Sequence, residues 1–399
     1  MYLFQKHLND LSHYFFLMIN LKEEYSTYKV LQHWKAEKEI REELIDLNDQ
    51  NNLLFDFLFQ KTKEIYNQLP KRKNGENPLI HPYNVFVILK RASVHDILTL
   101  SAGMLHDYVE EKVDLYKKEK GIRENEEGCA VLDQQELKIF VEFEKEMRSF
   151  CAKNNLDEKP CQEIIEILRL LTRHKRDIYY ETMVNLFTYP NEKIKRMAIE
   201  IKLADRMHNI LCIESFNPQQ RLYQCFKNLF ILNNTKKYLL ELKEREQEDQ
   251  ETEKLFKKCA KATYDAFLKV CSLCSAQGIS DVKSMLHLAF KKFALEKGGV
   301  WAVTNINEKE THPMRLFHGI IRKYDARLHQ EWEKFEGYRT KEKEYCIDFF
   351  ADYNFTLEQI DALLDYKDAY ALKEVVAYLM YLPEYIIGGF EYGRLFRDN

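Results

Sequence analysis

Glycine and proline are scarce in this sequence, with 12 and 8 of them among 399 residues. Folds rich in β-structure need many turns, and alternating β-branched strand patterns are nearly absent as well. The prolines instead stand just ahead of periodic apolar segments, as in PCQEIIEILRLL from Pro160. A proline in the first turn of a helix loses no hydrogen bond. We therefore predict an all-α chain.

Glycine-rich phosphate loops and long apolar runs are also missing. Neither GxGxxG nor GxxxxGK followed by Ser or Thr occurs, so a Rossmann or P-loop nucleotide site is not predicted. No stretch approaches the roughly 18 apolar residues that span a bilayer. The N-terminal apolar run LSHYFFLMIN is short, contains a histidine and lacks a small-residue cleavage site. We expect no membrane-spanning segment and a cytoplasmic location.

The chain has little net charge, −4 from 60 basic and 64 acidic residues. Because the two signs alternate along the sequence, no strong field selects nucleic acid or an anionic membrane, and we expect neither as a partner. The nine cysteines are scattered and odd in number. This pattern indicates reduced thiols rather than a disulfide framework. The sequence leaves the oligomeric state open.

Composition predicts substantial cores, since 45% of the residues are hydrophobic and 13% are aromatic. The length suggests about two domains. We distinguish an N-terminal helical extension (1–48), a central domain with every candidate site residue (49–245) and a C-terminal helical region of unknown role (246–399). In the last region, Thr356 and Gln359 stand at capping-box spacing before LEQIDALL.

One aspartate stands where an apolar residue is expected. In PNEKIKRMAIEIKLADRMHNI the apolar residues recur at helical intervals: Ile194, Ala198 and Ile201. The next position on this buried stripe is Asp205. An ionised carboxylate in a core is costly unless a positive charge meets it. Asp205 is therefore either the partner of a buried cation, such as Arg72 or Arg206, or a metal ligand.

A second acidic cluster follows the buried segment LTLSAGML. Uncharged residues lead into His106 and Asp107, which predicts a helix that begins buried and then turns polar. On one continuous helix, Asp107 faces Glu110 and Glu111, and His106 faces Glu110. Three carboxylates near one face repel one another strongly without a cation. This arrangement favours a metal site.

A third element, KRKNGENPLIHP, places His81 at a predicted helix start, with Pro82 behind it. Two imidazoles and two carboxylates are then available: His81, His106, Asp107 and Asp205. Such a mixed nitrogen and oxygen set suits Mn²⁺, Fe²⁺ or Zn²⁺ and leaves coordination positions for water. Taken alone, His81 has a simpler alternative role as a cap of that helix.

The remaining histidines of these segments receive simpler interpretations. We interpret His95 and His208 as structural histidines, because no neighbouring pattern supports another role. His174, in LLTRHKRD, is interpreted as a surface residue among basic neighbours.

Four stretches, RKNGENPLIHP, MLHDYVEE, LLTRHKRD and IKLADRMHNI, together resemble the hydrolase domain of RelA/SpoT homologues. This domain belongs to the His-Asp (HD) superfamily of metal phosphohydrolases, and the resemblance covers roughly residues 50 to 240. It implies an HD-type helical bundle that removes the 3′-pyrophosphate from guanosine tetra- and pentaphosphate. It also implies a single Mn²⁺, or another divalent transition metal, on four ligands: His81, His106, Asp107 and Asp205.

The resemblance assigns the other site residues as well. It implies that Glu110 and Glu111 act on the attacking water. The residues it implies for holding the nucleotide are Arg72, Lys73 and Asn209.

The sequence departs from the family pattern in the substrate contacts rather than in the metal ligands. The usual Glu-Asp pair is Glu110-Glu111, the usual serine is Asn74, and Ile210-Leu211-Cys212 replaces Met-Arg-Thr. Nothing after residue 245 resembles the synthetase domain, so alarmone synthesis is not expected. The alternatives are another nucleotide phosphoesterase (a nucleotidase or an NADPH phosphatase) or an HD domain that senses nucleotide without turnover.

Overall fold

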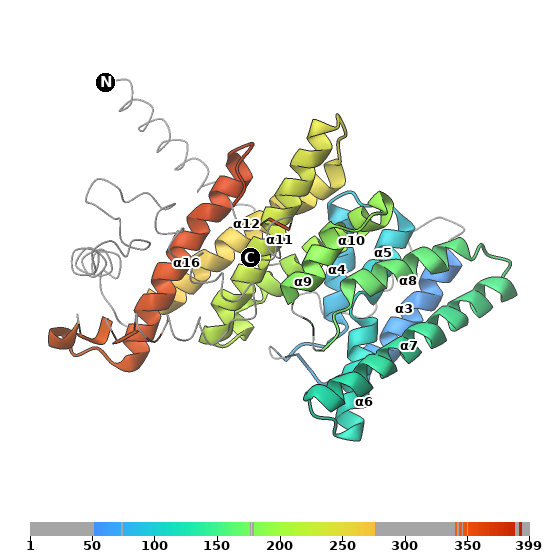
Figure 1. The fold of residues 1–399 in the computed structure, drawn as a ribbon, viewed down its shortest axis with the longest axis horizontal. Coiled ribbons are helices and arrows are strands. Elements are labelled where there is room, and N and C mark those ends of the chain that lie inside the picture. Colours follow the sequence, from blue (N-terminus) through green and yellow to red (C-terminus); the bar gives the residue numbers. More distant parts are fainter. Residues whose placement is uncertain are drawn as a thin grey trace. The chain divides into compact units, whose positions relative to one another are not determined.

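The computed structural model describes residues 52–72, 75–175, 177, 179–275, 340, 343–344, 346–348, 350–387 and 391–392. All regular structure in this part of the chain is helical, and no strand occurs in it, which confirms the predicted all-α class (Figure 1). The HD type of the bundle stays a prediction. The expected N-terminal extension, residues 1–48, lies outside the described residues.

The chain divides into two compact units, each described here by itself. Among the described residues, the first unit contains 52–215 and 234–259. The second contains 216–233, 260–275 and the described residues from 340 onward. The three-part division expected from the sequence stays a prediction.

The first unit is a bundle of helices. In chain order these are α3 (Asn52–Tyr66), α4 (Ile80–Arg91), α5 (Ile97–Leu105), α6 (Tyr108–Lys120), α7 (Glu126–Lys153), α8 (Lys159–Leu171), α9 (Tyr179–Phe187) and α10 (Glu192–Leu211), followed by the short 3₁₀ helix η1 (Ile213–Ser215). The long α7 packs against α6 and α8, and α3 packs against α5 and α6. Their apolar side chains, among them Leu58, Phe140 and Phe143, form a continuous core.

Polar side chains fix where several of these helices begin. Asp96 accepts a hydrogen bond from Thr99 N (2.9 Å), and Asn125 accepts one from Gly128 N (2.9 Å). Both therefore satisfy backbone donors that a helix start leaves free. Pro160 lies in the first turn of α8, as the sequence predicted.

The centre of the first unit is formed by α4, α5 and α10, which pack against one another (Figure 1). Every residue of α4 from Ile80 to Leu89 is buried. On α5, Gly103 permits a close approach to α4, because a Cβ at this position would lie 2.7 Å from Leu89 Cδ1. The predicted stripe on α10 is buried as well, including Asp205, which is 4% exposed. The three helices thus bring their polar residues together inside the unit.

Glu200, on the same helix, is a buried carboxyl that does not belong to the stripe of Asp205. It faces the start of α12 (Gln250–Ser275), where Thr252 Oγ1 donates a hydrogen bond to its Oε1 (3.3 Å). Burial and the charge of Asp249 raise the pKa of Glu200 to about 8, although Arg196 lies 3.9 Å away and acts in the opposite direction. A carboxyl with a raised pKa contributes fully to stability at a pH below 4.5, its ordinary pKa. This contribution is lost as the pH rises through 8.

We therefore expect Glu200→Gln to unfold at higher urea concentration than the parent at about pH 9 and at nearly the same concentration at about pH 4.5. Each pKa unit is worth about 1.4 kcal/mol, so the gain at high pH is on the order of a few kcal/mol. Urea unfolding at several pH values measures it. Glu248→Gln, on the exposed surface, is the control and leaves the pH dependence unchanged. Parallel stability curves for Glu200→Gln and the parent would contradict the argument.

The second unit contains parts of α11 (Pro218–Glu244) and α12, together with the 3₁₀ helix η2 (Ala351–Tyr353) and α16 (Leu357–Tyr381). The capping box expected from Thr356 and Gln359 is confirmed: Thr356 Oγ1 accepts from Gln359 N (3.2 Å), and Gln359 Oε1 accepts from Thr356 N (2.9 Å). Buried Asn233 binds both backbone groups of Ile387, accepting from its N–H at 2.6 Å.

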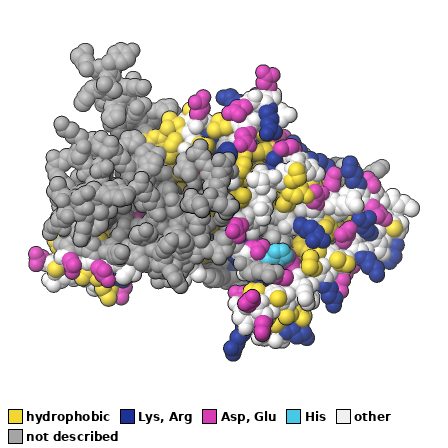
Figure 2. Space-filling view, in the orientation of Figure 1, with side chains coloured by type: hydrophobic (Ala, Val, Ile, Leu, Met, Phe, Trp, Pro, Cys, Tyr) yellow, Lys and Arg dark blue, Asp and Glu magenta, His cyan; other side chains and the backbone are white. Residues whose placement is uncertain are grey.

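The surface shows the charge balance of the sequence. On the face in Figure 2, Lys and Arg side chains are interspersed with Asp and Glu over most of the described surface. All nine cysteines are buried and free of disulfides. None of the helices that the structure describes is both long and apolar enough to cross a membrane.

Candidate metal centre

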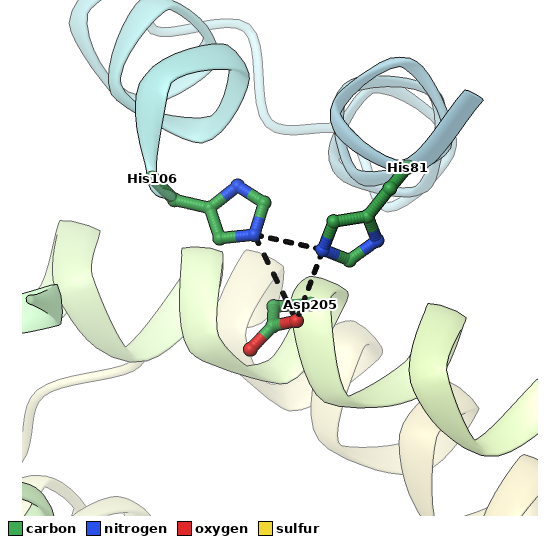
Figure 3. Close-up of side chains that lie close together, drawn as sticks. All are labelled: His81, His106 and Asp205. Atoms are coloured by element: carbon green, nitrogen blue, oxygen red, sulfur yellow. Dashed lines mark hydrogen bonds and ion pairs between the residues drawn. The ribbon is translucent and has the colours of Figure 1, made fainter. Parts of the chain in front are cut away.

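Three buried side chains, from α4, from α10 and from the turn after α5, converge in the first unit (Figure 3). His81 lies in the first turn of α4, His106 follows the last residue of α5, and Asp205 lies on α10. The Nε2 atoms of the two histidines are 3.0 Å apart. Asp205 Oδ1 is 3.5 Å from Nε2 of His81 and 3.8 Å from Nε2 of His106. One donor atom from each residue is therefore available to a single metal ion.

Asp107 joins this group from the more exposed side. Its Oδ2 lies 3.2 Å from His81 Nε2 and 3.1 Å from His106 Nε2. Donors on adjacent corners of an octahedron, with metal–ligand bonds of about 2.1 Å, lie about 3 Å apart. The structure thus places Asp107 beside both imidazoles, while the donor atoms that all lie within 4.8 Å of one another belong to His81, His106 and Asp205.

The His106-Asp107 pair lies at a break between two helices, not within one helix. α5 ends at Leu105 and α6 begins at Tyr108, with Asp107 at φ −102° and ψ 2° between them. At this point the carbonyl of Gly103 accepts a hydrogen bond from His106 Nδ1 (2.8 Å). On a regular helix, consecutive side chains point about 100° apart. The expectation of one continuous helix is wrong, and the break allows both side chains to reach the same place.

Both carboxylates of the group are held in the ionised form that metal ligands need. Asp205 Oδ2 pairs with Lys202 Nζ (2.9 Å), and its Oδ1 accepts a hydrogen bond from Asn209 Nδ2 (2.6 Å). Burial opposes ionisation, but the charges of Lys202 and His106 outweigh it and hold the pKa of Asp205 well below its ordinary value. Burial is likewise outweighed at Asp107, where His106 keeps the pKa well below the ordinary range.

The two imidazoles present their Nε2 atoms to the centre of the group. Because a carbonyl only accepts, His106 carries a proton on Nδ1 and directs Nε2 toward the carboxylates. Burial lowers the pKa of His106, yet Asp107 and Asp205 raise it to about 9, so a cation on its Nε2 would have to displace a proton from this ring. Burial lowers the pKa of His81, which is therefore neutral. The donor set of two imidazoles and two carboxylates fits a divalent transition metal.

The acidic pair lies in the first turn of α6, directly after the proposed ligands. Glu110 and Glu111 are both half-buried, and Glu110 Oε1 accepts a hydrogen bond from Arg173 N (2.8 Å). Burial and the charge of Asp107 raise the pKa of both carboxyls, that of Glu111 to about 7. A carboxyl with a pKa near 7, as at Glu111, binds and releases a proton near neutral pH, which is the property required of a general base.

Of the three residues expected to hold a nucleotide, the structure describes Arg72 and Asn209. Arg72 lies in the loop before α4, where its N–H donates to Glu76 O (3.0 Å), and its charge adds to burial in lowering the pKa of His81. Asn209 lies beside the group through its bond to Asp205. Lys73 lies outside the described residues. A cavity of about 410 Å³ adjoins the loop, with Tyr66 and Ile80 in its lining.

The structure also shows contacts for two histidines that were given no role at the metal centre, His208 and His174. His208 Nδ1 lies 2.7 Å from His81 Nδ1, so this histidine, interpreted as structural, contacts a candidate ligand. His174 was expected on the surface, and its side chain is 41% exposed. Its Nδ1 lies 2.9 Å from Glu136 Oε1. Lys202 forms an ion pair with Asp205, a cation partner other than the two arginines weighed as alternatives to a metal ion. The spacing of Lys202, Asp205 and His208, three residues apart on one helix, was the available signal.

Comparison of the chain with protein-family models, with curated proteins and with solved structures finds no match. The resemblance to the RelA/SpoT hydrolase domain therefore stays a prediction that rests on the four sequence stretches alone.

Proposed function

We propose that this protein is a metal-dependent phosphohydrolase that removes the 3′-pyrophosphate from guanosine tetra- or pentaphosphate. The observation that carries the proposal is the convergence of His81, His106, Asp107 and Asp205, with nitrogen–oxygen separations from 3.1 to 3.8 Å. Two half-buried glutamates with raised pKa values follow these residues on α6. The nucleotide part of the proposal is supported by the sequence resemblance.

The proposed roles follow from the chemistry of each side chain. A divalent cation, when bound, lowers the pKa of a water molecule and polarises a phosphoryl oxygen. Glu110 and Glu111 would accept the proton of the attacking water, a contribution of about 10²–10⁴-fold in typical enzymes. Arg72 and Lys73 would meet the phosphate charge through charge-assisted hydrogen bonds. Asn209 has a second N–H to offer the nucleotide besides the one donated to Asp205.

With Mn²⁺ present, we expect the purified protein to release pyrophosphate from guanosine tetraphosphate, and to lose this activity when a chelator is added. Arg72→Ala should raise KM and keep the metal, because it removes a charge-assisted contact to substrate and no ligand. The measurement is a nucleotide panel with phosphate and pyrophosphate both quantified. Arg91→Ala, exposed at the end of α4, is the matched control and leaves KM unchanged.

The same panel separates the alternative functions. Cleavage of nucleoside monophosphates or of the NADPH 2′-phosphate, with guanosine tetraphosphate untouched, would replace the proposal by another nucleotide phosphoesterase. Tight nucleotide binding without turnover would replace it by a sensor domain.

A further inference from the structure

Behind His81, two further polar side chains continue inward from the candidate metal centre. His81 Nδ1 lies 2.7 Å from His208 Nδ1, and His208 Nε2 lies 3.0 Å from the side-chain amide of Asn84. All three are almost completely buried, with exposed fractions of 4% for His81, 1% for His208 and 0% for Asn84. A polar chain of this kind in a core needs a complete set of hydrogen bonds.

Two arrangements of protons satisfy the two imidazole rings. Each neutral ring carries one proton, and only one proton fits between two ring nitrogens. In the first arrangement His208 Nδ1 donates to His81 Nδ1, so His81 keeps its own proton on Nε2, which faces the carboxylates. In the second, His81 Nδ1 donates to His208 Nδ1, and His81 Nε2 is left with a lone pair. Only the second arrangement leaves Nε2 able to bind a metal.

Asn84 decides between these arrangements. In the second arrangement His208 carries its proton on Nε2, which then needs an acceptor, and Asn84 is the group there. The structure directs Asn84 Nδ2 toward His208, while Asn84 Oδ1 is buried without a hydrogen-bond partner. Half a turn of the amide exchanges the two atoms and presents the oxygen to His208. The number of protons on these three side chains is the same in both arrangements.

We propose that His208 and Asn84 are positioning residues that hold His81 in the tautomer whose Nε2 binds the metal. This inference rests on the proposed metal centre. His106 has a fixed acceptor for its Nδ1 in the carbonyl of Gly103, which cannot exchange roles. His81 has an imidazole there instead, so its tautomer follows the orientation of the Asn84 amide. Metal binding and the half-turn of this amide are therefore coupled.

The test measures Mn²⁺ affinity, not activity. We expect Asn84→Leu and His208→Phe to weaken Mn²⁺ binding by about 10–100-fold, the usual effect of removing a group behind a ligand. Asn84→Asp, which presents an acceptor in either orientation, should bind Mn²⁺ at least as tightly as the parent. Thr62→Val is the control: its hydroxyl is equally buried but bonds to the carbonyls of Leu58 and Met104. It should leave Mn²⁺ affinity unchanged.

A second measurement needs no variant and so does not depend on how the variants fold. In the Zn²⁺-loaded parent, imidazole ¹⁵N shifts should place the proton of His81 on Nδ1 and that of His208 on Nε2. A proton on His208 Nδ1, or parental Mn²⁺ affinity in folded Asn84→Leu and His208→Phe, would overturn the positioning role alone. A parent that binds no divalent metal would overturn the metal centre together with this inference.

Discussion

Asp205→Ala and His106→Ala should each abolish stoichiometric Mn²⁺ binding and, with it, hydrolysis. Each substitution removes one of four donors and the charge balance around it. Without Asp205, Lys202 loses its carboxylate partner at 2.9 Å. Without His106, Asp107 loses a nitrogen 3.1 Å away and the main influence that keeps its pKa low. Elemental analysis after dialysis against Mn²⁺ measures occupancy, and pyrophosphate release measures activity.

Two checks separate loss of a ligand from loss of the fold. Breaking a buried ion pair from one side costs about 3–5 kcal/mol, so circular dichroism and thermal unfolding must accompany the Asp205→Ala measurement. Asp114→Ala is the matched control, because it removes an exposed carboxylate on α6 that pairs with Lys175 (2.7 Å). It should retain full occupancy. Full metal occupancy in Asp205→Ala or His106→Ala would contradict the four-ligand assignment.

Much of the fold follows from local sequence signals. The apolar interval from Ile194 to Ile201 predicted the buried stripe of α10, and the spacing of Thr356 and Gln359 predicted the start of α16. Both signals act within one or two helical turns, so they operate regardless of the rest of the chain. The break after Leu105 could not be predicted in this way. It depends on the His106 side chain bonding to the Gly103 carbonyl while its ring faces α4.

The candidate site shows the same division between local and tertiary information. The sequence was enough to name the residues that meet at the centre, because each stands in a distinctive stretch. It was not enough to find what lies behind them. His208 contacts His81 only because α4 packs against α10, and these two helices lie far apart in the chain. A contact of that kind leaves no periodic pattern, so a lone histidine on an apolar helix is correctly interpreted as structural until the packing is known.

Glu110→Gln and Glu111→Gln should keep the metal and lose most of the rate. Glutamine has the shape of glutamate but accepts no proton, so the expected loss in kcat is about 10²–10⁴-fold for the residue that acts as base. The glutamine oxygen can still accept the hydrogen bond of Arg173 N, so Glu110→Gln should leave the loop after α8 in place. The measurement is kcat at saturating Mn²⁺, with metal content determined on the same samples.

The comparison between the two variants identifies the base. Both carboxyls have raised pKa values, but only Glu110 is tied to a backbone N–H, which favours its ionised form. Glu119→Gln, exposed on the same helix beside Lys120, is the control and should retain the parental rate. If both test variants turn over substrate at the parental rate, neither glutamate acts on the water. If one of them instead loses the metal, that glutamate belongs to the ligand set, because removing a base alone leaves every metal bond in place.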